Sequence, residues 1–174
     1  NNVPEWYIWS CKKIQYMFPK AHAAAYVMMA YRIAYFKVFY PLAYYAAYFS
    51  IRAKAFSYET MCQGKDKLQY FMGEYEKKQK DGTIANKEED ALGDMRIVQE
   101  MYARGYEFVK IDIFTAHSRN FQIVDGKIMP ALSSIDGLGE KAADAIVEAA
   151  KDGPFLSKED FRIRTKASKT VIEL

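Results

Sequence analysis

The sequence is poor in cysteine and carries no large excess of charge of either sign. Its two cysteines, Cys11 and Cys62, are far apart among 174 residues, which argues against a disulfide framework or a zinc knuckle and favours reduced, buried thiols. The formal net charge is only +3, so any binding of nucleic acid would depend on local clusters of charge. These shortages leave an ordinary globular chain with one or two domains.

An uninterrupted apolar run of membrane-spanning length is also lacking. The most apolar region, residues 21–51, contains Arg32 and Lys37, and a cation at the centre of a bilayer costs roughly 2.5–3.5 kcal/mol. Residues 1–19 lack the basic start and apolar core of a signal peptide. We therefore expect a cytoplasmic protein without a membrane partner. Because the chain starts in an aromatic stretch and stops within a helical pattern, we also expect a fragment of a longer protein.

The hydrophobic periodicity predicts a mainly α-helical chain with a small antiparallel β unit, which is an α+β fold. Pro19 and Pro41 divide the first helices, since proline interrupts a helix but fits the first turn of the next one. Asn86, followed three residues later by Glu89, has the spacing of a capping box. We interpret the acidic residues 88–90 as a solvated first turn rather than as a metal site.

Helices are expected at residues 5–18, 21–40, 42–49 and 65–80, from the cap at Asn86 to Gly105, at residues 158–164, and from residue 168 onward.

The period changes at Phe108, where apolar and polar residues begin to alternate. The alternation over residues 109–114 predicts a strand. Residues 121–124, followed by the turn signal Asp125-Gly126, predict a second strand, and residues 127–129 predict a third. This β unit leads directly into the last helical part of the chain.

Residues 132–147 contain the most informative pattern, two short helices joined by a turn with Gly137 and Gly139. Glycine tolerates a positive φ and lets another surface come close to the backbone. The helix that follows presents free N–H groups and a partial positive charge, an arrangement that binds anions such as phosphate. The alternative is an ordinary helix–helix turn in which glycine merely ends a helix. The inner faces of the two helices are expected to bury Ile135, Leu138, Ala143, Ile146 and Val147.

A second candidate site lies at the start of the helix that follows Pro19. Lys20 and His22 precede a run of alanines and then Tyr26, so these two side chains would hold phosphates while the phenol ring stacks on a base or sugar. The small alanines would let a large ligand approach the backbone. The alternative is that His22 is an ordinary core or surface histidine and that Tyr26 belongs to the core.

Two blocks of sequence are distinctive when taken together. The first consists of Met17-Phe-Pro-Lys20-Ala-His22-Ala-Ala-Ala-Tyr26-Val, Arg32-Ile-Ala-Tyr35-Phe-Lys37-Val with Tyr40-Pro41, and Tyr48-Phe-Ser-Ile-Arg52-Ala. The second consists of Arg104-Gly-Tyr-Glu-Phe, Ile135-Asp-Gly137-Leu-Gly139, Phe155-Leu-Ser-Lys-Glu-Asp and Arg164-Thr-Lys-Ala-Ser-Lys-Thr. The first block resembles the fingers of C-family bacterial replicative polymerases, most closely the alpha subunit of DNA polymerase III of the PolC type. The second resembles the C-terminal duplex-binding region of that family, with tandem helix-hairpin-helix elements, whereas residues 60–100 match only loosely.

The resemblance implies that the parent protein is an enzyme, a DNA-directed DNA polymerase (a nucleotidyltransferase) that adds deoxynucleotides to a primer on a template. Chemistry of this kind uses divalent metal ions, here Mg, held by carboxylates of the palm. The catalytic aspartates of the family lie before this stretch, so we expect no catalytic residue, no metal site and no polymerase activity in the chain alone. The C-terminal tail of the family, which binds the sliding clamp, is likewise expected to be absent.

The resemblance also implies roles for single residues. Lys20 and His22 would face the triphosphate of the incoming deoxynucleotide, and Tyr26 and Arg32 would help to shape that pocket. Family members commonly have histidine where this chain has Phe39, so a polar role is not expected there. Contacts with the primer–template duplex would come from Ile135, Gly137, Leu138, Gly139 and Lys141.

Four regions follow from the resemblance: a fingers segment (1–58), a helical connector (59–107), the β unit (108–130) and a tandem helix-hairpin-helix domain that binds duplex DNA (131–174). Two other functions stay open. One is a non-catalytic helix-hairpin-helix DNA-binding module of a repair or recombination protein, which would have no need of the block from Lys20 to Tyr26. The other is a structural helical domain whose glycine turns only pack.

Overall fold

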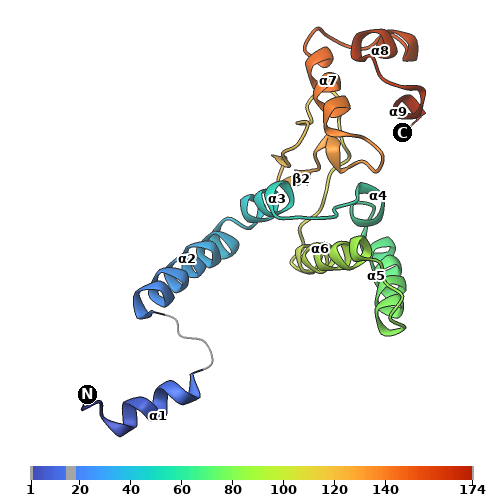
Figure 1. Ribbon diagram of the computed structural model, residues 1–174. Helices are drawn as coiled ribbons and strands as arrows, with labels where there is room; N and C mark the ends of the chain where they lie inside the picture. The colour runs from blue at the N-terminus through green and yellow to red at the C-terminus, as the bar shows by residue number, and fades with distance from the viewer. Residues whose placement is uncertain (1, 15–18, 174) are drawn as a thin grey trace.

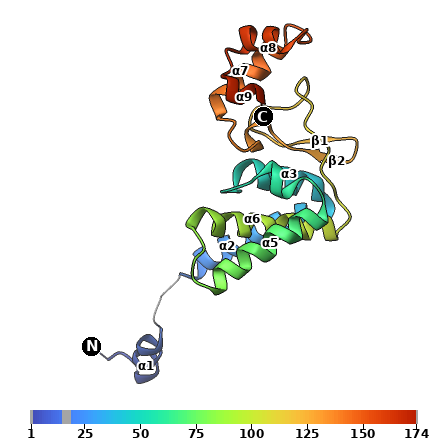
Figure 2. The same cartoon turned by 90° about the vertical axis from the view of Figure 1, so that its right-hand side faces the viewer.

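The chain folds into helices with one two-stranded antiparallel sheet, and the expected fold class is confirmed (Figure 1). The computed structural model describes residues 2–14 and 19–173. Both views show α3 in the middle, with α5 and α6 on one side of it and the sheet and α7 on the other (Figures 1 and 2). The elements in chain order are α1 (Glu5–Lys13), α2 (Lys20–Phe39), α3 (Pro41–Ile51), α4 (Tyr58–Met61), α5 (Lys65–Lys80), α6 (Asn86–Ala103), β1 (Gln122–Val124), β2 (Lys127–Met129), the 3-10 helix η1 (Leu132–Ser134), α7 (Glu140–Ala150), α8 (Lys158–Thr165) and α9 (Lys169–Glu173).

Helix α2 begins directly after Pro19 and ends at Phe39, as the prolines of the sequence predicted. Pro41 is the first residue of α3, where its missing N–H interrupts no helical hydrogen bond. None of the twenty residues of α2, all of which are described, is buried. In the part of the chain that the structure describes, no helix is long and apolar enough to cross a membrane.

Helix α1 is shorter than the sequence predicted. It ends at Lys13, and Ile14 already has an extended backbone (φ −84°, ψ 104°). The remaining residues of the expected helix, 15–18, lie outside the described residues. Figure 2 shows α1 apart from the helices that surround the core.

Four phenylalanines from separate segments meet in the main core. The ring centroid of Phe49, in α3, lies 5.1 Å from that of Phe56, 5.6 Å from that of Phe108 and 5.6 Å from that of Phe121. Phe56 and Phe121 are 4.9 Å apart in an edge-on arrangement. Aromatic pairs of this kind contribute about 0.5–1.5 kcal/mol each beyond the burial of their area. The cluster therefore joins α3 to the segment before α4, the segment after α6 and the residue that precedes β1.

Helices α5 and α6 lie side by side and close the same core (Figure 2). The apolar stripe that the sequence predicted for α6, Leu92, Met95, Val98 and Tyr102, is buried. The hydroxyl of Tyr102 donates to the carbonyl of Met61 at 3.0 Å, and burial raises the pKa of Tyr102 to about 12. Tyr102 therefore stays a neutral donor that links α6 to the end of α4.

Asp94 is a buried carboxylate of α6 that holds the end of α3. Its exposed fraction is 3%, and its Oδ2 atom accepts hydrogen bonds from the N–H groups of Lys54 at 2.9 Å and Ala55 at 2.8 Å. Burial raises the pKa of Asp94, although both hydrogen bonds favour the charged form. The backbone that leaves α3 is thereby tied to α6.

The sheet separates two hydrophobic cores. Strands β1 and β2 pair in the expected place, and Asp125 and Gly126, both with positive φ, form the predicted turn between them. Successive residues of a strand point to opposite faces, so Ile128 enters the main core while Met129 enters a second core. Leu138, Ala143 and Ile146 are buried in the second core as predicted, with Ile135 and Val147 partly buried against it.

The strand expected over residues 109–114 is wrong. Phe108 forms a single parallel bridge with Ile128, and the residues after it belong to no strand. The carboxylate of Asp112 instead accepts a hydrogen bond from the N–H of Phe114 at 3.0 Å and stabilises a turn. The alternation has another cause, because three of these residues pack against the second core. They are Val109, Ile111 and Ile113.

The predicted start of α6 is also corrected. The helix has no capping box at Asn86 and Glu89, because Asn86 is already its first helical residue. The carboxylate of Glu88 folds back to accept from the N–H of Ala85 at 3.0 Å. The cap is therefore shifted by one residue, since both positions offer an acidic side chain at a similar spacing.

The first helix expected in the glycine hairpin is only one 3-10 turn, η1. Its segment is held from outside instead: the N–H of Leu132 donates to the carbonyl of His117 at 3.1 Å, and that of Ser133 to the carbonyl of Ser118 at 2.9 Å. These hydrogen bonds satisfy N–H groups that have no acceptor within the helical turn itself, since the first N–H groups of a helix lack partners inside it.

Replacing Phe49 with alanine should lower the free energy of unfolding by about 3–5 kcal/mol, because it leaves a cavity where four segments meet. Phe39→Ala is the control, since Phe39 is 64% exposed on α2, and its effect should stay within about 0.5 kcal/mol. Urea unfolding followed by circular dichroism measures both values. Equal losses for the two variants would contradict the central role of the phenylalanine cluster.

Candidate nucleic-acid interface

The turn between η1 and α7 is closed by its own backbone. The N–H of Leu138 donates to the carbonyl of Ile135 at 3.0 Å, and Gly137 occupies the third position of the turn with a φ of +89°. A residue with a Cβ atom is strained in this region, so the turn requires glycine there. Gly137 therefore serves the fold whether or not a ligand binds.

Gly139 has a different environment. It is the N-cap of α7 with φ −71° and ψ 154°, a conformation open to any residue, and a Cβ atom built on it meets nothing within 4 Å. It offers no side chain to accept from the first N–H groups of α7. The start of α7 thus combines backbone donors with a residue that leaves room for an anion to approach them.

The five residues predicted to bind duplex DNA lie together at this turn, but they are not equally accessible. Gly137, Gly139 and Lys141 are exposed. Leu138 is 7% exposed and Ile135 is partly buried, so the side chains of both belong to the second core. The surface that remains is mainly backbone, with the exposed residue Lys141 in the first turn of α7.

Arg119, which the sequence analysis did not identify, reaches this surface from the loop before β1. Its guanidinium lies 3.3 Å from Oε2 of Glu140 and 2.5 Å from Oδ2 of Asp144. The hydrogen bond from Arg119 lowers the pKa of Asp144. The loop itself is held by His117, whose Nδ1 atom accepts from the N–H groups of Arg119 and Asn120 at 3.0 Å each. No sequence motif marks Arg119, because its partners come from a helix much later in the chain.

Asp136 ties the hairpin turn to the start of α4. The hydroxyl of Ser57 donates to Oδ2 of Asp136 and also caps α4 by accepting from the N–H of Thr60 at 3.3 Å. The orientation of the turn is therefore set partly by α4. This contact was also missed, since a single serine far from the hairpin gives no signal in the sequence.

The second helical pair, α8 and α9, supports α7. Helix α8 begins after the predicted cap Ser157. The guanidinium of Arg164 donates to the carbonyls of Gly153 at 3.1 Å and Pro154 at 3.0 Å, just beyond the end of α7. The turn between α8 and α9 contains Lys166 at a φ of +55° rather than glycine. Arg164 is thus engaged in holding the two helical pairs together.

Helix α2 carries the four residues predicted to bind a nucleotide along an exposed surface. The rings of His22 and Tyr26 lie one turn apart, with centroids 4.7 Å from each other in an edge-on arrangement. A helix advances by about 100° per residue, so Lys20 projects from nearly the opposite side to His22. Arg32 lies roughly 15 Å further along the axis than His22, at about 1.5 Å per residue. The helix therefore brings His22 and Tyr26 together, and it places Lys20 and Arg32 on other sides.

No metal centre is formed within residues 2–14 and 19–173, where no group of three or more histidine, cysteine, aspartate and glutamate side chains could hold an ion. Cys11 and Cys62 are free thiols. The acidic residues at the start of α6 are engaged with lysines: Glu88 binds Lys78, and Asp90 lies 3.1 Å from the ammonium group of Lys54. Glu88 thus links α6 to α5, and Asp90 links α6 to the segment after α3.

Comparisons with known proteins give this geometry a context. Residues 105–174 match the family described as the helix-hairpin-helix motif. Over 173 residues, 99% of this chain, the sequence is 51% identical to a protein named DNA polymerase III PolC-type from Streptococcus sanguinis (strain SK36). The identity is 50% to the protein of the same name from Streptococcus pyogenes serotype M5 (strain Manfredo) and 49% to that from Streptococcus agalactiae serotype III (strain NEM316). The resemblance to PolC-type DNA polymerase III is confirmed, and the chain spans 12% of the length of these relatives.

The two glycines of the hairpin should respond differently to substitution. Gly137→Ala should lower the free energy of unfolding by about 1–2 kcal/mol, because alanine is strained at positive φ. Gly139→Ala should change it by no more than about 0.5 kcal/mol, since the weaker cap is offset by the reduced entropy of the unfolded chain. Urea denaturation of both variants tests this difference. A large loss for Gly139→Ala would mean that the fold itself needs glycine at that position.

Proposed function

We propose that this chain, similar to PolC-type DNA polymerase III along almost its whole length, is the fingers and duplex-binding part of a replicative DNA-directed DNA polymerase. The observation that carries the proposal is the 51% identity over 173 residues. The exposed backbone donors at the start of α7 support it, because they suit a protein that holds DNA by its phosphates. In this proposal the longer protein extends primers in the cytoplasm.

The hairpin would bind the sugar-phosphate backbone of the primer–template duplex without reading its sequence. The first N–H groups of α7 carry a partial positive charge, and Gly139 leaves room for a phosphate to reach them. Lys141 would add an ammonium group at the edge of the same surface. Contacts with phosphates position a protein on DNA but carry no sequence information. Such binding suits a polymerase, which must hold every sequence.

Helix α2 would contribute to the pocket for the incoming deoxynucleoside triphosphate. We assign the most direct contact to His22 and Tyr26, because their rings lie together with centroids 4.7 Å apart. Lys20, predicted to face the triphosphate with His22, and Arg32, predicted to shape the pocket with Tyr26, project from other sides of the helix, so their contacts would not come from the surface that His22 and Tyr26 form. The exposed surface of α2 supports this assignment, since a ligand can reach all four residues.

The chemical step belongs, in this proposal, to the rest of the longer protein. Carboxylates there would hold Mg ions that activate the primer hydroxyl and stabilise the leaving pyrophosphate. The described residues offer no cluster of metal ligands, so no step of the chemistry is assigned to them. The chain alone is then expected to bind primer–template DNA without extending it.

A helix-hairpin-helix module of a repair or recombination protein is the second candidate. It would account for the match of residues 105–174. It would not account for the identity that continues through α2 and the helices after it to cover 99% of the chain. We therefore place it second.

The proposed duplex contact predicts salt-dependent binding that Gly139→Ala weakens. A labelled primer–template duplex, titrated with the chain at two salt concentrations, should bind less tightly at the higher one, because phosphate contacts release bound counterions. A methyl group at residue 139 would stand where a phosphate approaches and should cost about tenfold in affinity, or about 1.4 kcal/mol. Gly93→Ala in α6 is the matched control, since a Cβ atom there also meets nothing within 4 Å. Equal affinities for the wild-type chain and Gly139→Ala, or binding independent of salt, would contradict the proposed contact.

Arg119 should support the same contact by neutralising Glu140 and Asp144. Arg119→Gln would leave both carboxylates facing the DNA and should weaken duplex binding roughly fivefold. Glu140→Gln should restore part of that affinity in the Arg119→Gln background. Fluorescence anisotropy with the labelled duplex measures each variant. A loss that Glu140→Gln does not relieve would mean that Arg119 contacts the DNA itself.

A further inference from the structure

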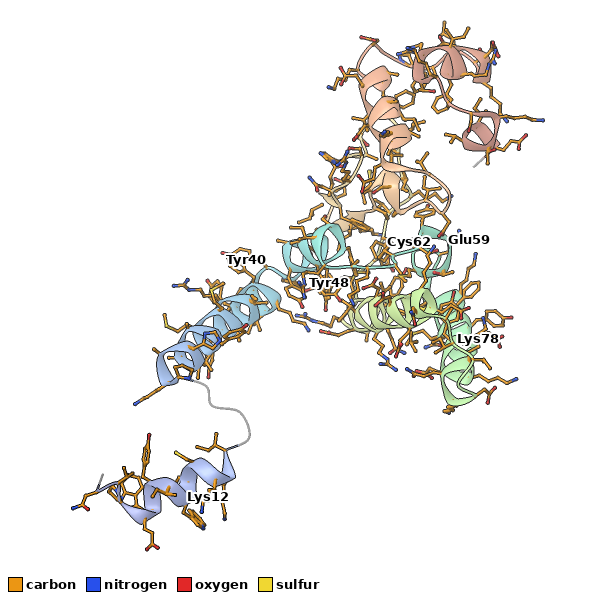
Figure 3. The ribbon with its side chains drawn as sticks, viewed as in Figure 1. Lys12, Tyr40, Tyr48, Glu59, Cys62 and Lys78 are labelled. Atoms are coloured by element: carbon orange, nitrogen blue, oxygen red, sulfur yellow. The ribbon has the colours of Figure 1, made fainter. Side chains whose placement is uncertain are left out.

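Helix α2 extends away from α3, and nearly all of its residues are exposed (Figure 1). Each of its twenty residues is described and none is buried, so burial of apolar side chains does little to fix it. Figure 3 shows Tyr40 at the junction where α2 ends and α3 begins. Tyr40 has a non-helical backbone (φ −134°, ψ 55°), and Pro41 follows it without an N–H group. The junction therefore ends one helix before the next begins.

A cluster of polar groups joins the last turns of α2 to the end of α6. We call Lys37, Tyr45, Glu100 and Arg104 the Glu100 cluster. The Nζ atom of Lys37 lies 2.8 Å from Oε2 of Glu100, and the hydroxyl of Tyr45 donates to Oε1 at 3.0 Å. Arg104 donates from Nη1 to the hydroxyl of Tyr45 at 3.1 Å and from Nη2 to the carbonyl of Lys37 at 3.0 Å. The side chain of Lys37 is thus bound by Glu100 of α6, and its backbone by Arg104, the residue that follows α6.

The geometry of the Glu100 cluster makes these contacts stronger than those of an isolated surface pair. The carbonyl of Lys37 is among the last four of α2, which lack helical partners and carry partial negative charge. The planar guanidinium of Arg104 reaches this carbonyl and Tyr45 at once, which a lysine ammonium could not reproduce in the same way. Tyr45 is fully buried at 0% exposure, while the side chains of Lys37 and Glu100 are 33% and 37% exposed. The cluster is therefore only partly screened by solvent.

The charges of the cluster persist at neutral pH. Burial alone would raise the pKa of Glu100, but hydrogen bonds from Lys37 and Tyr45, with the charges of Lys37 and Arg104, hold that pKa below its ordinary value. The hydrogen bond to Glu100 raises the pKa of Lys37. Glu100 is therefore an anion and Lys37 a cation at neutral pH.

We propose that Glu100 is a positioning residue for α2. Glu100 binds Lys37 directly and, together with Tyr45, holds Arg104 in place. These contacts set the direction of α2 about the Tyr40–Pro41 junction. The inference rests on these contacts and not on the proposed function. If α2 faces a nucleotide, the same contacts would determine where His22 and Tyr26 stand. A residue of α6 would then govern a site that it does not touch.

The direction of α2 can be measured by electron spin resonance between labels on α2 and α6. Ala24→Cys and Glu89→Cys place labels at exposed positions of the two helices, in a chain that also carries Cys11→Ser and Cys62→Ala. Glu100→Gln should shift and broaden the distribution of distances between the labels. Lys37→Gln, a change at the surface that leaves the core intact, should have the same effect to a smaller degree. Raising the salt concentration should broaden the distribution of the unmodified cluster as well, because its ion pair is partly exposed.

Lys54→Gln is the matched control. It removes another lysine that pairs with α6, through Asp90 at 3.1 Å, but Lys54 lies after α3 and does not hold α2. The distribution should stay unchanged in this variant. Circular dichroism tests whether each variant is folded. If Glu100→Gln is not folded, the distance distribution of Lys37→Gln tests the proposal. An unchanged distribution in Lys37→Gln and Glu100→Gln, or equal broadening in Lys54→Gln, would overturn the proposal.

Discussion

The packing of four phenylalanine rings around Phe49 decides where the other parts of the chain can lie. Each ring comes from a different segment, so the cluster forms only when α3, the segment before α4, the segment after α6 and the residue that precedes β1 are all in place. Ser50, next to Phe49, adds a polar contact by accepting from the N–H of Phe121 at 2.8 Å. Helix α2 leaves this core at one end of α3, and the glycine hairpin follows from the sheet on its other side (Figure 1). Both candidate sites are thus carried by one set of aromatic contacts.

Local signals made much of this fold predictable. Pro19 and Pro41 determine where α2 and α3 begin because proline restricts the backbone before any tertiary contact forms. Asp125-Gly126 likewise determines the turn of the sheet, since both residues accept positive φ. The strand predicted after Phe108 is wrong because an alternating pattern shows only which side chains are buried. A segment can bury alternate residues without pairing as a strand. The capping residue of α6 was misplaced because two neighbouring acids satisfy the same spacing.

The candidate sites were predictable only where their residues are neighbours in sequence. The hairpin turn was found from the spacing of its two glycines, and its exposed surface is real. Arg119, Glu100 and Ser57 could not be found in this way, since their partners are brought to them by the fold alone. The proposed division of the chain into four regions stays a prediction, as do the roles of single residues. Residues of all four regions, including Ala131 of the last one, belong to the main core.

The basic residues show why counting charge is a poor guide to a DNA-binding surface. Arg104, Arg119 and Arg164 all donate to acceptors of the protein itself, two of them to backbone carbonyls beyond or at the end of a helix. Arginine suits this structural use because its fork of donors can bridge several acceptors. The surface open to an anion is therefore better described by exposed backbone donors than by the number of cations.

The sheet that stands between the two cores has a consequence for how the sequence can change over time. Ile128 and Met129 are adjacent, and they serve different cores because they point to opposite faces of β2. Insertion or deletion of a single residue between the turn and β2 would exchange the two faces and send each side chain to the wrong side. Substitutions of Ile128 or Met129 that conserve the size of the side chain should be tolerated. Insertions and deletions in β2 should be removed by selection. Divergence in residues 121–132 is thus expected to proceed by replacement at constant length, with gaps confined to the loops outside it.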